Sequence, residues 1–472
     1  MLTKDLASAT SGAAAATAIL NARNVYNRLL ESPENPQARL ESRLFLQQQL
    51  AWTCQRPHDF PTEPTRLTHW MEQNTLKVGE RYADYLDRRG QGAPRQYFST
   101  RSQALSFLQQ VAPTKLVDGS WLYGSLQHWK DIRFSGLILT YLEELGEGDP
   151  TLNHVILYRR LLAENGCDTL PEFSDEHYVR GAIQLALAYN ADQFLPELVG
   201  YNLGYEQLPL HLLITAFELA ELNIDPFYFT LHITVDNAST GHARKAVEAV
   251  QACMPIVDDK KNFWRRVSNG YRLNDLGLSA DAIVQSFDLE DELLRMLERK
   301  RIYGQNIHSD FCTIGGLTVN EWLSAPGRAQ MFLKTLEEKR WIIRNEDPQK
   351  SRFWRLIDGP QAPMTGVFDG YEKQLLHDWI SAQNVTRQAP PKRRNFRRYR
   401  KRSTTNYRVS SDRTDSSGDV NQEVRCVQRE LLRLSHEQRM QRLIHYMSPS
   451  KHTSPAGLFA TREFVCAFSG EV

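Results

Sequence analysis

Apolar residues recur at intervals of three and four from the start of the chain to residue 252, a spacing that lines one face of an α-helix. Short connections rich in Gly, Pro and Asp separate the segments that have this pattern. No alternation of strand and helix is present there, so the pattern predicts a mainly α fold. Helices are expected over 16–30, 37–53, 66–88, 97–112, 126–145, 151–164, 175–195, 207–222 and 227–252.

The pattern changes after residue 256, where helical segments are mixed with short runs typical of strands. WIIR (341–344) and RFWRLI (352–357) are two such runs, separated by a connection that contains Asp-Pro. In 308–312 a His, an Asp and a Cys alternate before two glycines, which predicts a short strand with these side chains on one face. We therefore expect a small appended α+β module over 257–385.

Residues 386–420 are rich in Pro, Arg and Ser and contain almost no aliphatic side chains. Such a segment cannot bury enough apolar surface to fold by itself, so a flexible basic linker is predicted. Within it, 392–402 holds eight Lys or Arg in eleven residues together with two aromatic residues, which would also allow weak, salt-sensitive contact with nucleic acid. A helical pattern returns in the C-terminal segment, 421–472, which should dock on the body of the protein or on a partner.

The chain has 472 residues, of which 41% are apolar and 24% charged, as in ordinary globular proteins. This length exceeds that of one compact domain. We expect an N-terminal helical region over 1–114 that packs on a central helical core over 115–256. No apolar run reaches about 18 residues, the length needed to span a bilayer. The Ala-rich start with Asp5 is unlike a secretory signal, so a cytoplasmic protein is expected.

Cysteine content and charge narrow the chemistry further. The six cysteines are scattered with no pair at CxxC spacing, which argues against both a zinc knuckle and a disulfide framework. The net charge is only +1, yet 386–413 contains eleven basic residues and one acidic residue, so the rest of the chain is net acidic. The basic character is therefore local.

The stretch LHITVDNASTGHARKA (231–246) places two imidazoles and a carboxylate in one predicted helix. His232 and Asp236 are four residues apart and share a face, whereas His242 lies about a quarter turn away. A second junction, YLEELGEGDPTLNH, brings Glu144 at the end of one helix to His154 in the opening turns of the next. These residues are candidates for a metal site.

Glu197 follows a proline within LPELVGYNLGYE and has mostly apolar neighbours, so its carboxylate must be paired, protonated or bound to a metal. Glu206 and Glu218 are alternative ligands from the same part of the chain, and Glu206 would lie half a turn from Glu197 on a continuous helix. Glu144, His154, Glu197, His232, Asp236 and His242 together supply three carboxylates and three imidazoles without thiolates. This is the ligand set of a non-haem di-iron site.

Together, YLEELGEGDPTLNH, LPELVGYNLGYE and HITVDNASTGH resemble the haem-oxygenase-like di-iron oxidases and oxygenases, the iron-containing redox enzyme family. The resemblance covers about residues 115 to 255 and implies an all-helical, haem-oxygenase-like bundle. In this family one helical region supplies Glu and then His, a second supplies Glu, and a third supplies His-x-x-x-Asp-x-x-His. The resemblance thus assigns Glu144 and His154 to the first region, Glu197 to the second, and His232 and Asp236 to the third.

The chain departs from this pattern at the last ligand. Ser239 stands where the pattern has His, and His242 follows three residues later. Either a bulge in the helix brings His242 inward, or the second metal is weakly held.

The resemblance implies a catalytic metal centre with two Fe ions per chain, which activates O2 and uses it on an amino-acid-derived or fatty-acid-like small molecule. N-oxygenation, desaturation and oxidative C–C cleavage are the implied reactions. No flavin or iron–sulfur motif is present, so an external electron donor is also implied. The protein could form a homodimer, and no membrane partner is expected.

Two other interpretations use the same scaffold. The first is a non-catalytic helical interaction protein with a degenerate metal site, for which Ser239 would be the first sign. The second is haem degradation, which needs a proximal histidine early in the bundle. His58 and His69 precede the region of resemblance and do not fit that role.

Overall fold

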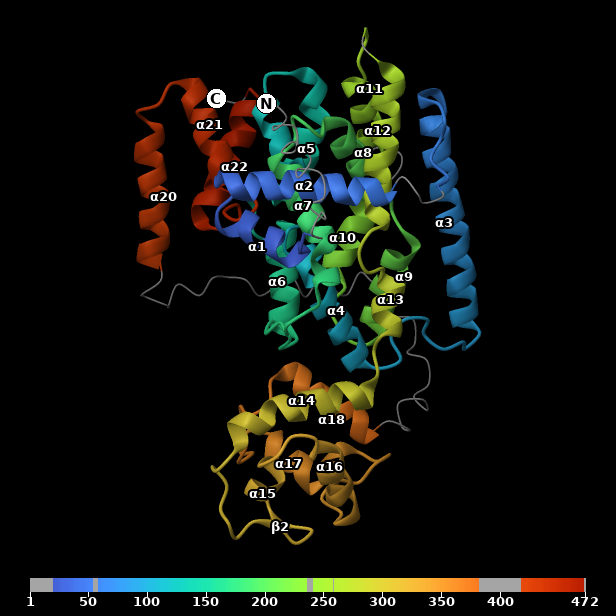
Figure 1. Cartoon of the computed structure of the whole chain (residues 1–472), viewed down its shortest axis with the longest axis vertical. Helices are drawn as coiled ribbons and strands as arrows, with labels where there is room; N and C mark the ends of the chain where they lie inside the picture. Colours follow the sequence, from blue (N-terminus) through green and yellow to red (C-terminus); the bar gives the residue numbers. More distant parts are fainter. Residues whose placement is uncertain (1–19, 54–57, 236–240, 258, 382–416, 471–472) are drawn as a thin grey trace, which may run out of the picture.

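The computed structural model describes residues 20–53, 58–235, 241–257, 259–381 and 417–470. Helices make up nearly all of the regular structure in these ranges (Figure 1). The strands that the described residues form are β1 (Thr313–Ile314) and β2 (Leu317–Thr318), an antiparallel pair of two residues each. The predicted mainly α fold is therefore confirmed.

Most helices of the main body lie within segments that the apolar pattern predicts, but the helix expected over 126–145 begins only at Ser135, and the helix Leu195–Tyr205 is not among the expected helices. Its longer helices are α1 (Ala22–Glu31), α2 (Pro36–Thr53), α3 (Leu67–Gly90), α4 (Arg101–Lys115), α5 (Ser135–Glu144), α6 (His154–Glu164), α7 (Val179–Tyr189), α8 (Leu195–Tyr205), α9 (Leu210–Glu221), α10 (Phe227–Val235), α11 (His242–Cys253), α12 (Lys260–Arg272) and α13 (Ala280–Gln285). Short 3₁₀ turns join several of them: η1 (Pro64–Arg66), η2 (Ser120–His128), η3 (Ile132–Phe134), η4 (Gly146–Gly148), η5 (Asp175–Tyr178) and η6 (Leu273–Asp275).

The single helix expected over 227–252 is wrong. The described residues of this stretch form two helices, α10 and α11, and α11 begins only at His242. Gly241 precedes α11 with extended backbone, φ −86° and ψ −164°, so one continuous helix cannot run into His242. Residues 236–240, which include Asp236 and Ser239, lie outside the described residues.

Helix α8 packs along α12 at very short distance, although α12 falls within the residues that we assign to the appended module. A Cβ atom built on Gly200 would lie 2.0 Å from the carbonyl oxygen of Val267. A Cβ atom built on Gly270 would lie 2.0 Å from the carbonyl oxygen of Glu197. Only glycines allow this backbone contact, which fixes the place of α8 and of Glu206 at its end.

The following helices form a separate lobe, at the bottom of Figure 1. Its elements are α14 (Leu289–Gly304), the β1–β2 pair, α15 (Val319–Leu323), α16 (Ala329–Glu338), η7 (Pro348–Lys350), α17 (Arg352–Ile357) and α18 (Gly370–Ser381). The strands expected at 341–344 and 352–357 are wrong. Residues 352–357 form α17, because Phe353, Trp354 and Ile357 share a helical face and are all buried.

The C-terminal helices α20 (Ser417–Leu431), α21 (His436–Tyr446) and α22 (Pro455–Phe468) return to the main body, where they lie against its side (Figure 1). The Tyr141 hydroxyl of α5 donates a hydrogen bond to the carbonyl oxygen of Met447 at 2.6 Å. Residues 382–416, which include most of the linker predicted over 386–420, lie outside the described residues. Of the C-terminal segment predicted over 421–472, side chains are described for residues 422–470, and the name refers to these residues from here on.

Buried apolar side chains form two clusters, and both reach the same region. Val117 and Leu145 belong to the first cluster, whereas Tyr158 and Tyr228 belong to the second. Glu144 adjoins Leu145 along the chain, and His154 and His232 lie one helical turn from Tyr158 and Tyr228. These three predicted ligands therefore lie where the two cores meet. In the part of the chain that the structure describes, no helix is both long and apolar enough to cross a bilayer.

His452, between α21 and α22, makes the fold sensitive to acid. Burial and the nearby charge of Arg159 lower the pKa of its imidazole from 6.5 to about 3. Below about pH 6.5 the unfolded chain binds a proton here that the folded chain does not, so acidification favours unfolding by about 1.4 kcal/mol per pH unit. We expect the free energy of unfolding, measured with urea at each pH, to fall between about pH 6 and pH 4. His452→Asn should reduce that slope, and an equal slope in the variant would contradict this assignment.

Candidate metal centre

Four buried side chains from separate elements converge between the two cores: Asp118, Glu144, His154 and His232. One possible ligand atom of each lies within 4.8 Å of those of all the others. Two carboxylates and two imidazoles at this spacing match the oxygen and nitrogen ligands of iron and similar divalent metals.

Asp118 follows the end of α4 and precedes Gly119, which has φ 75°. A Cβ atom on residue 119 would lie 2.7 Å from Cβ of Glu144. Glycine is required here for both reasons, and it lets the Asp118 backbone approach the end of α5. The position of Asp118 beside Glu144 thus depends on a single glycine.

The Asp118 carboxylate accepts hydrogen bonds from two tyrosine hydroxyls, those of the partly buried Tyr205 and the buried Tyr228. Tyr205 donates to Oδ1 at 2.5 Å, and Tyr228 donates to Oδ2. Lys115 Nζ lies 3.7 Å from Oδ2 and donates to the Tyr205 hydroxyl at 2.9 Å. Burial, with the charge of Asp118, raises the pKa of both tyrosines well above the ordinary value, so their hydroxyls stay protonated and donate.

Glu144 and His154 face each other across the turn between α5 and α6. Oε2 of Glu144 lies 2.6 Å from Nδ1 of His154, and both side chains are 3% exposed. Among the described residues, neither of these two buried atoms has a hydrogen-bond partner with acceptable geometry, despite the short distance. Buried polar atoms usually have partners, and a cation bound by both atoms would supply one. The residues present therefore fit a metal ion.

The imidazole of His232 is held in one orientation. Nδ1 lies 2.8 Å from the carbonyl oxygen of Tyr228, one helical turn earlier, and a carbonyl can only accept. Nδ1 therefore carries the proton, and Nε2 faces the cluster, 3.3 Å from Oδ2 of Asp118. A backbone acceptor on the far nitrogen is the usual arrangement for a metal-binding histidine.

A second buried group shares Glu144 with the first: Glu144, Glu206 and His242. Nδ1 of His242 lies 3.0 Å from Oε2 of Glu206 and 3.6 Å from Oε1 of Glu144. The two oxygens of Glu144 thus face different groups, Oε2 toward His154 and Oε1 toward His242.

His242 is also oriented from behind. Its Nε2 lies 2.6 Å from Oε2 of Glu143, and Oε1 of Glu143 accepts from Lys245 at 2.5 Å. Burial by itself raises the pKa of Glu143, but hydrogen bonds from His242 and Lys245 outweigh it and lower that pKa. The ionised Glu143 fixes the proton of His242 on Nε2 and leaves Nδ1 toward the second group.

The first group concentrates negative charge in a buried place. Burial favours the neutral acid at Asp118, yet Lys115 and His232 hold the pKa of this carboxyl well below its usual range. Burial also favours the neutral acid at Glu144, but the nearby His154 outweighs this effect and lowers the pKa of Glu144. Two ionised carboxylates with oxygen atoms within 4.8 Å of each other need nearby positive charge, to which a metal ion would contribute.

Four of the six residues predicted as ligands lie in these two groups: Glu144, His154, His232 and His242. The structure does not bring Glu197 to them. Its carboxylate forms a two-pronged ion pair with Arg266, at 2.7 Å to Nε and 2.6 Å to Nη2. This pair explains a carboxylate in apolar surroundings without a metal. The sixth residue, Asp236, lies outside the described residues.

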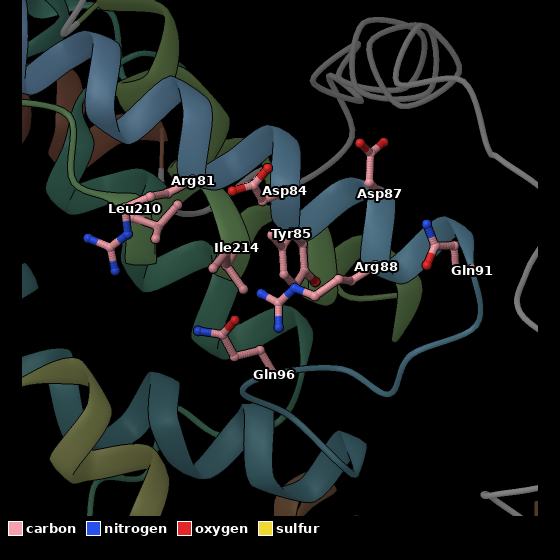
Figure 2. Close-up of a pocket in the computed structure, with 9 residues that line it drawn as sticks. All are labelled: Arg81, Asp84, Tyr85, Asp87, Arg88, Gln91, Gln96, Leu210 and Ile214. Carbon is pink, nitrogen blue, oxygen red and sulfur yellow. The ribbon is translucent and has the colours of Figure 1, made fainter.

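Glu218, the other alternative ligand, has a structural role. It accepts from the Tyr85 hydroxyl at 2.8 Å and from the backbone N–H groups of Tyr97 and Phe98 at 2.9 Å each. These bonds hold the connection between α3 and α4 onto α9. An open pocket of about 600 Å³ lies beside it between α3 and α9, lined by Arg81, Asp84, Tyr85, Asp87, Arg88, Gln91, Gln96, Leu210 and Ile214 (Figure 2).

Asp118 is not among the ligands predicted from the sequence, and Glu206 was predicted only as an alternative to Glu197. An Asp-Gly pair directly after an apolar helix is the signal for Asp118, since it marks a tight turn that leaves the carboxylate near a helix end. For Glu206 the spacing was correct, because it and Glu197 do face different ways. The partner of the Glu197 carboxylate is Arg266, which lies 69 residues away in the chain.

Comparison with known proteins agrees with this geometry. Residues 105–275 match the model of a haem-oxygenase-like family described as iron-containing redox enzyme. This range includes every residue of the two groups. No curated protein and no solved structure matches the chain. The match fits a buried histidine and carboxylate centre that suits iron.

Proposed function

We propose that the protein is a non-haem di-iron oxidoreductase that activates O2, because residues 105–275 match the model of the iron-containing redox enzyme family. The observation that carries the proposal is the position of Glu144 in both ligand groups. One carboxylate with its two oxygens toward two sets of ligands is the arrangement of a bridge between two metal ions.

The two groups would offer different numbers of ligands, four residues in the first and three in the second. Asp118, His154 and His232 would bind the first ion together with Glu144, whereas Glu206 and His242 would complete the second with the shared carboxylate. Iron accepts more ligands than either group offers, so both ions would keep open positions for O2 or substrate. When bound, the reduced iron pair would supply the electrons for O2 reduction and the oxidising power used on the substrate.

The chain itself would deliver a proton to Asp118. Lys115, whose side chain is 15% exposed, donates to Tyr205, and Tyr205 donates to Oδ1 of Asp118. This row of donors connects the partly exposed ammonium group with a carboxylate of the site. We expect a proton that enters at Lys115 Nζ to arrive at Asp118 Oδ1 by shifts along these two hydrogen bonds.

The substrate class in the proposal is an amino-acid-derived or fatty-acid-like small molecule, undergoing N-oxygenation, desaturation or oxidative C–C cleavage. Its support is the resemblance of YLEELGEGDPTLNH, LPELVGYNLGYE and HITVDNASTGH to the haem-oxygenase-like oxidases and oxygenases. An external electron donor completes the proposal, since neither ligand group of the described residues contains a cysteine for an iron–sulfur cluster.

Anaerobic loading with Fe(II), elemental analysis and stopped-flow mixing with O2 test the proposal. We expect about two irons per chain and an absorbance change on mixing with O2 in the wild type. His232→Ala should lose both signals, because it removes Nε2 from the first group.

His211→Ala is the matched control for this experiment. His211, on the neighbouring α9, is a neutral histidine, since burial and nearby cations lower its pKa to about 4, and it belongs to neither ligand group. It should keep both signals. No iron above background in the wild type would refute the enzyme and favour the alternative, a non-catalytic interaction protein with a degenerate metal site.

A further inference from the structure

The turn between the two ligands Glu144 and His154 has an unusual backbone. Gly146, Glu147 and Gly148 have φ of 62°, 51° and 85°, so three consecutive residues lie in the left-handed region. This conformation is strained for Glu147, which has a Cβ. Strain of this kind persists only where surrounding contacts hold it, so the contacts of the turn help to determine where both ligands lie.

The C-terminal segment makes such contacts with the turn itself. Nη1 of Arg462, on α22, donates to the carbonyl oxygen of Gly148 at 2.7 Å. A Cβ atom on Gly148 would lie 2.5 Å from the carbonyl oxygen of Leu458, one turn earlier on α22. Helix α22 is therefore packed directly on the turn, with no room for a side chain at residue 148.

A second contact reaches the residue before His154. Nδ1 of the buried His452 lies 3.1 Å from Nδ2 of Asn153. The lowered pKa of His452 keeps its ring neutral, so that Nδ1 can accept this hydrogen bond. Asn153 also donates to the carbonyl oxygen of Leu145 at 3.2 Å, and its Oδ1 caps α6 by accepting from the N–H of Ile156. One side chain thus joins the end of α5, the start of α6 and the C-terminal segment.

From these contacts we propose that the C-terminal segment positions the metal ligands, with Arg462 and His452 as the positioning residues. The inference rests on the proposed di-iron site. The segment holds α5 through Tyr141, the turn through Gly148 and the start of α6 through Asn153. Docking of the segment and metal binding then stabilise each other, because a coupling between two binding events is reciprocal.

Anaerobic titration with Co(II), monitored by visible absorbance, measures how the C-terminal segment affects the affinity of the site for metal. We expect His452→Ala and Arg462→Ala to weaken Co(II) binding about 10- to 100-fold, the usual effect of removing groups that orient ligands. His452→Asn should restore binding, because the Asn oxygen takes the place of Nδ1. Arg439→Ala is the matched control, since Arg439 pairs with Glu463 within the segment, and it should bind Co(II) like the wild type.

Hydrogen exchange of the full chain measures the reverse effect, the protection of the C-terminal segment by bound metal. Adding Co(II) to the wild type should slow amide exchange in α22 as well as near residues 144–154, and in His452→Ala the effect on α22 should be lost. Two Co(II) ions bound equally tightly by the wild type and both alanine variants would overturn the inference alone. No Co(II) bound by the wild type would overturn the proposed function, and the inference with it.

Discussion

Glu144→Gln is expected to reduce bound iron from about two ions per chain to one or fewer and to weaken metal binding at least about 100-fold. Gln keeps the size of Glu, but its amide offers one oxygen and an N–H₂ group, so it cannot connect two cations. In the structure Oε2 faces His154 and Oε1 faces His242, and the substitution removes one of these two ligand atoms. Elemental analysis after anaerobic Fe(II) loading and gel filtration gives the iron content.

Glu197→Gln is the matched control for this prediction. It makes the same chemical change on a buried glutamate that was itself predicted as a ligand, yet in the structure it affects only the ion pair with Arg266. We expect it to keep the iron content of the wild type. Iron loss from Glu197→Gln equal to that from Glu144→Gln would mean that the ligand assignment is wrong.

Gly270→Ala is expected to destabilise the fold by about 3 kcal/mol, the upper part of the usual range for overpacking. The added Cβ would lie 2.0 Å from the Glu197 carbonyl oxygen and 2.5 Å from its Cα, and neither backbone atom can move without shifting α8 against α12. Because Glu206 follows α8 directly, we also expect weaker iron binding in the variant that still folds. Urea denaturation followed by circular dichroism measures the change in stability.

Gly79→Ala is the control for that substitution. Gly79 lies within α3, and a Cβ there would meet no atom within 4 Å. Ala has the higher helix propensity, so this variant should be more stable by roughly 0.5–1 kcal/mol. Destabilisation of Gly270→Ala by less than about 1 kcal/mol would show that the two helices separate easily.

Local sequence pattern predicted the helices well where one face is apolar and a clear stop follows. The expected helix at 37–53 is found as Pro36–Thr53, and that at 66–88 as Leu67–Gly90. The pattern failed where helix and strand have similar signals. RFWRLI at 352–357 is short and bulky enough for either, and packing of its buried face in the lobe makes it a helix.

The sequence by itself pointed to Glu144, His154, His232 and His242, which the structure brings together, because buried imidazoles and carboxylates near helix ends need a partner wherever they fold. Tertiary structure alone added Asp118 and Glu206, the other two members of the groups that could hold metal. Arg266 neutralises Glu197 from α12, and the close contact at Gly119 brings Asp118 to Glu144. Charge pairing and close backbone contact depend on residues far apart in the chain, and periodicity reports only on neighbours. Which buried carboxylate remains available to a metal is therefore a property of the folded chain.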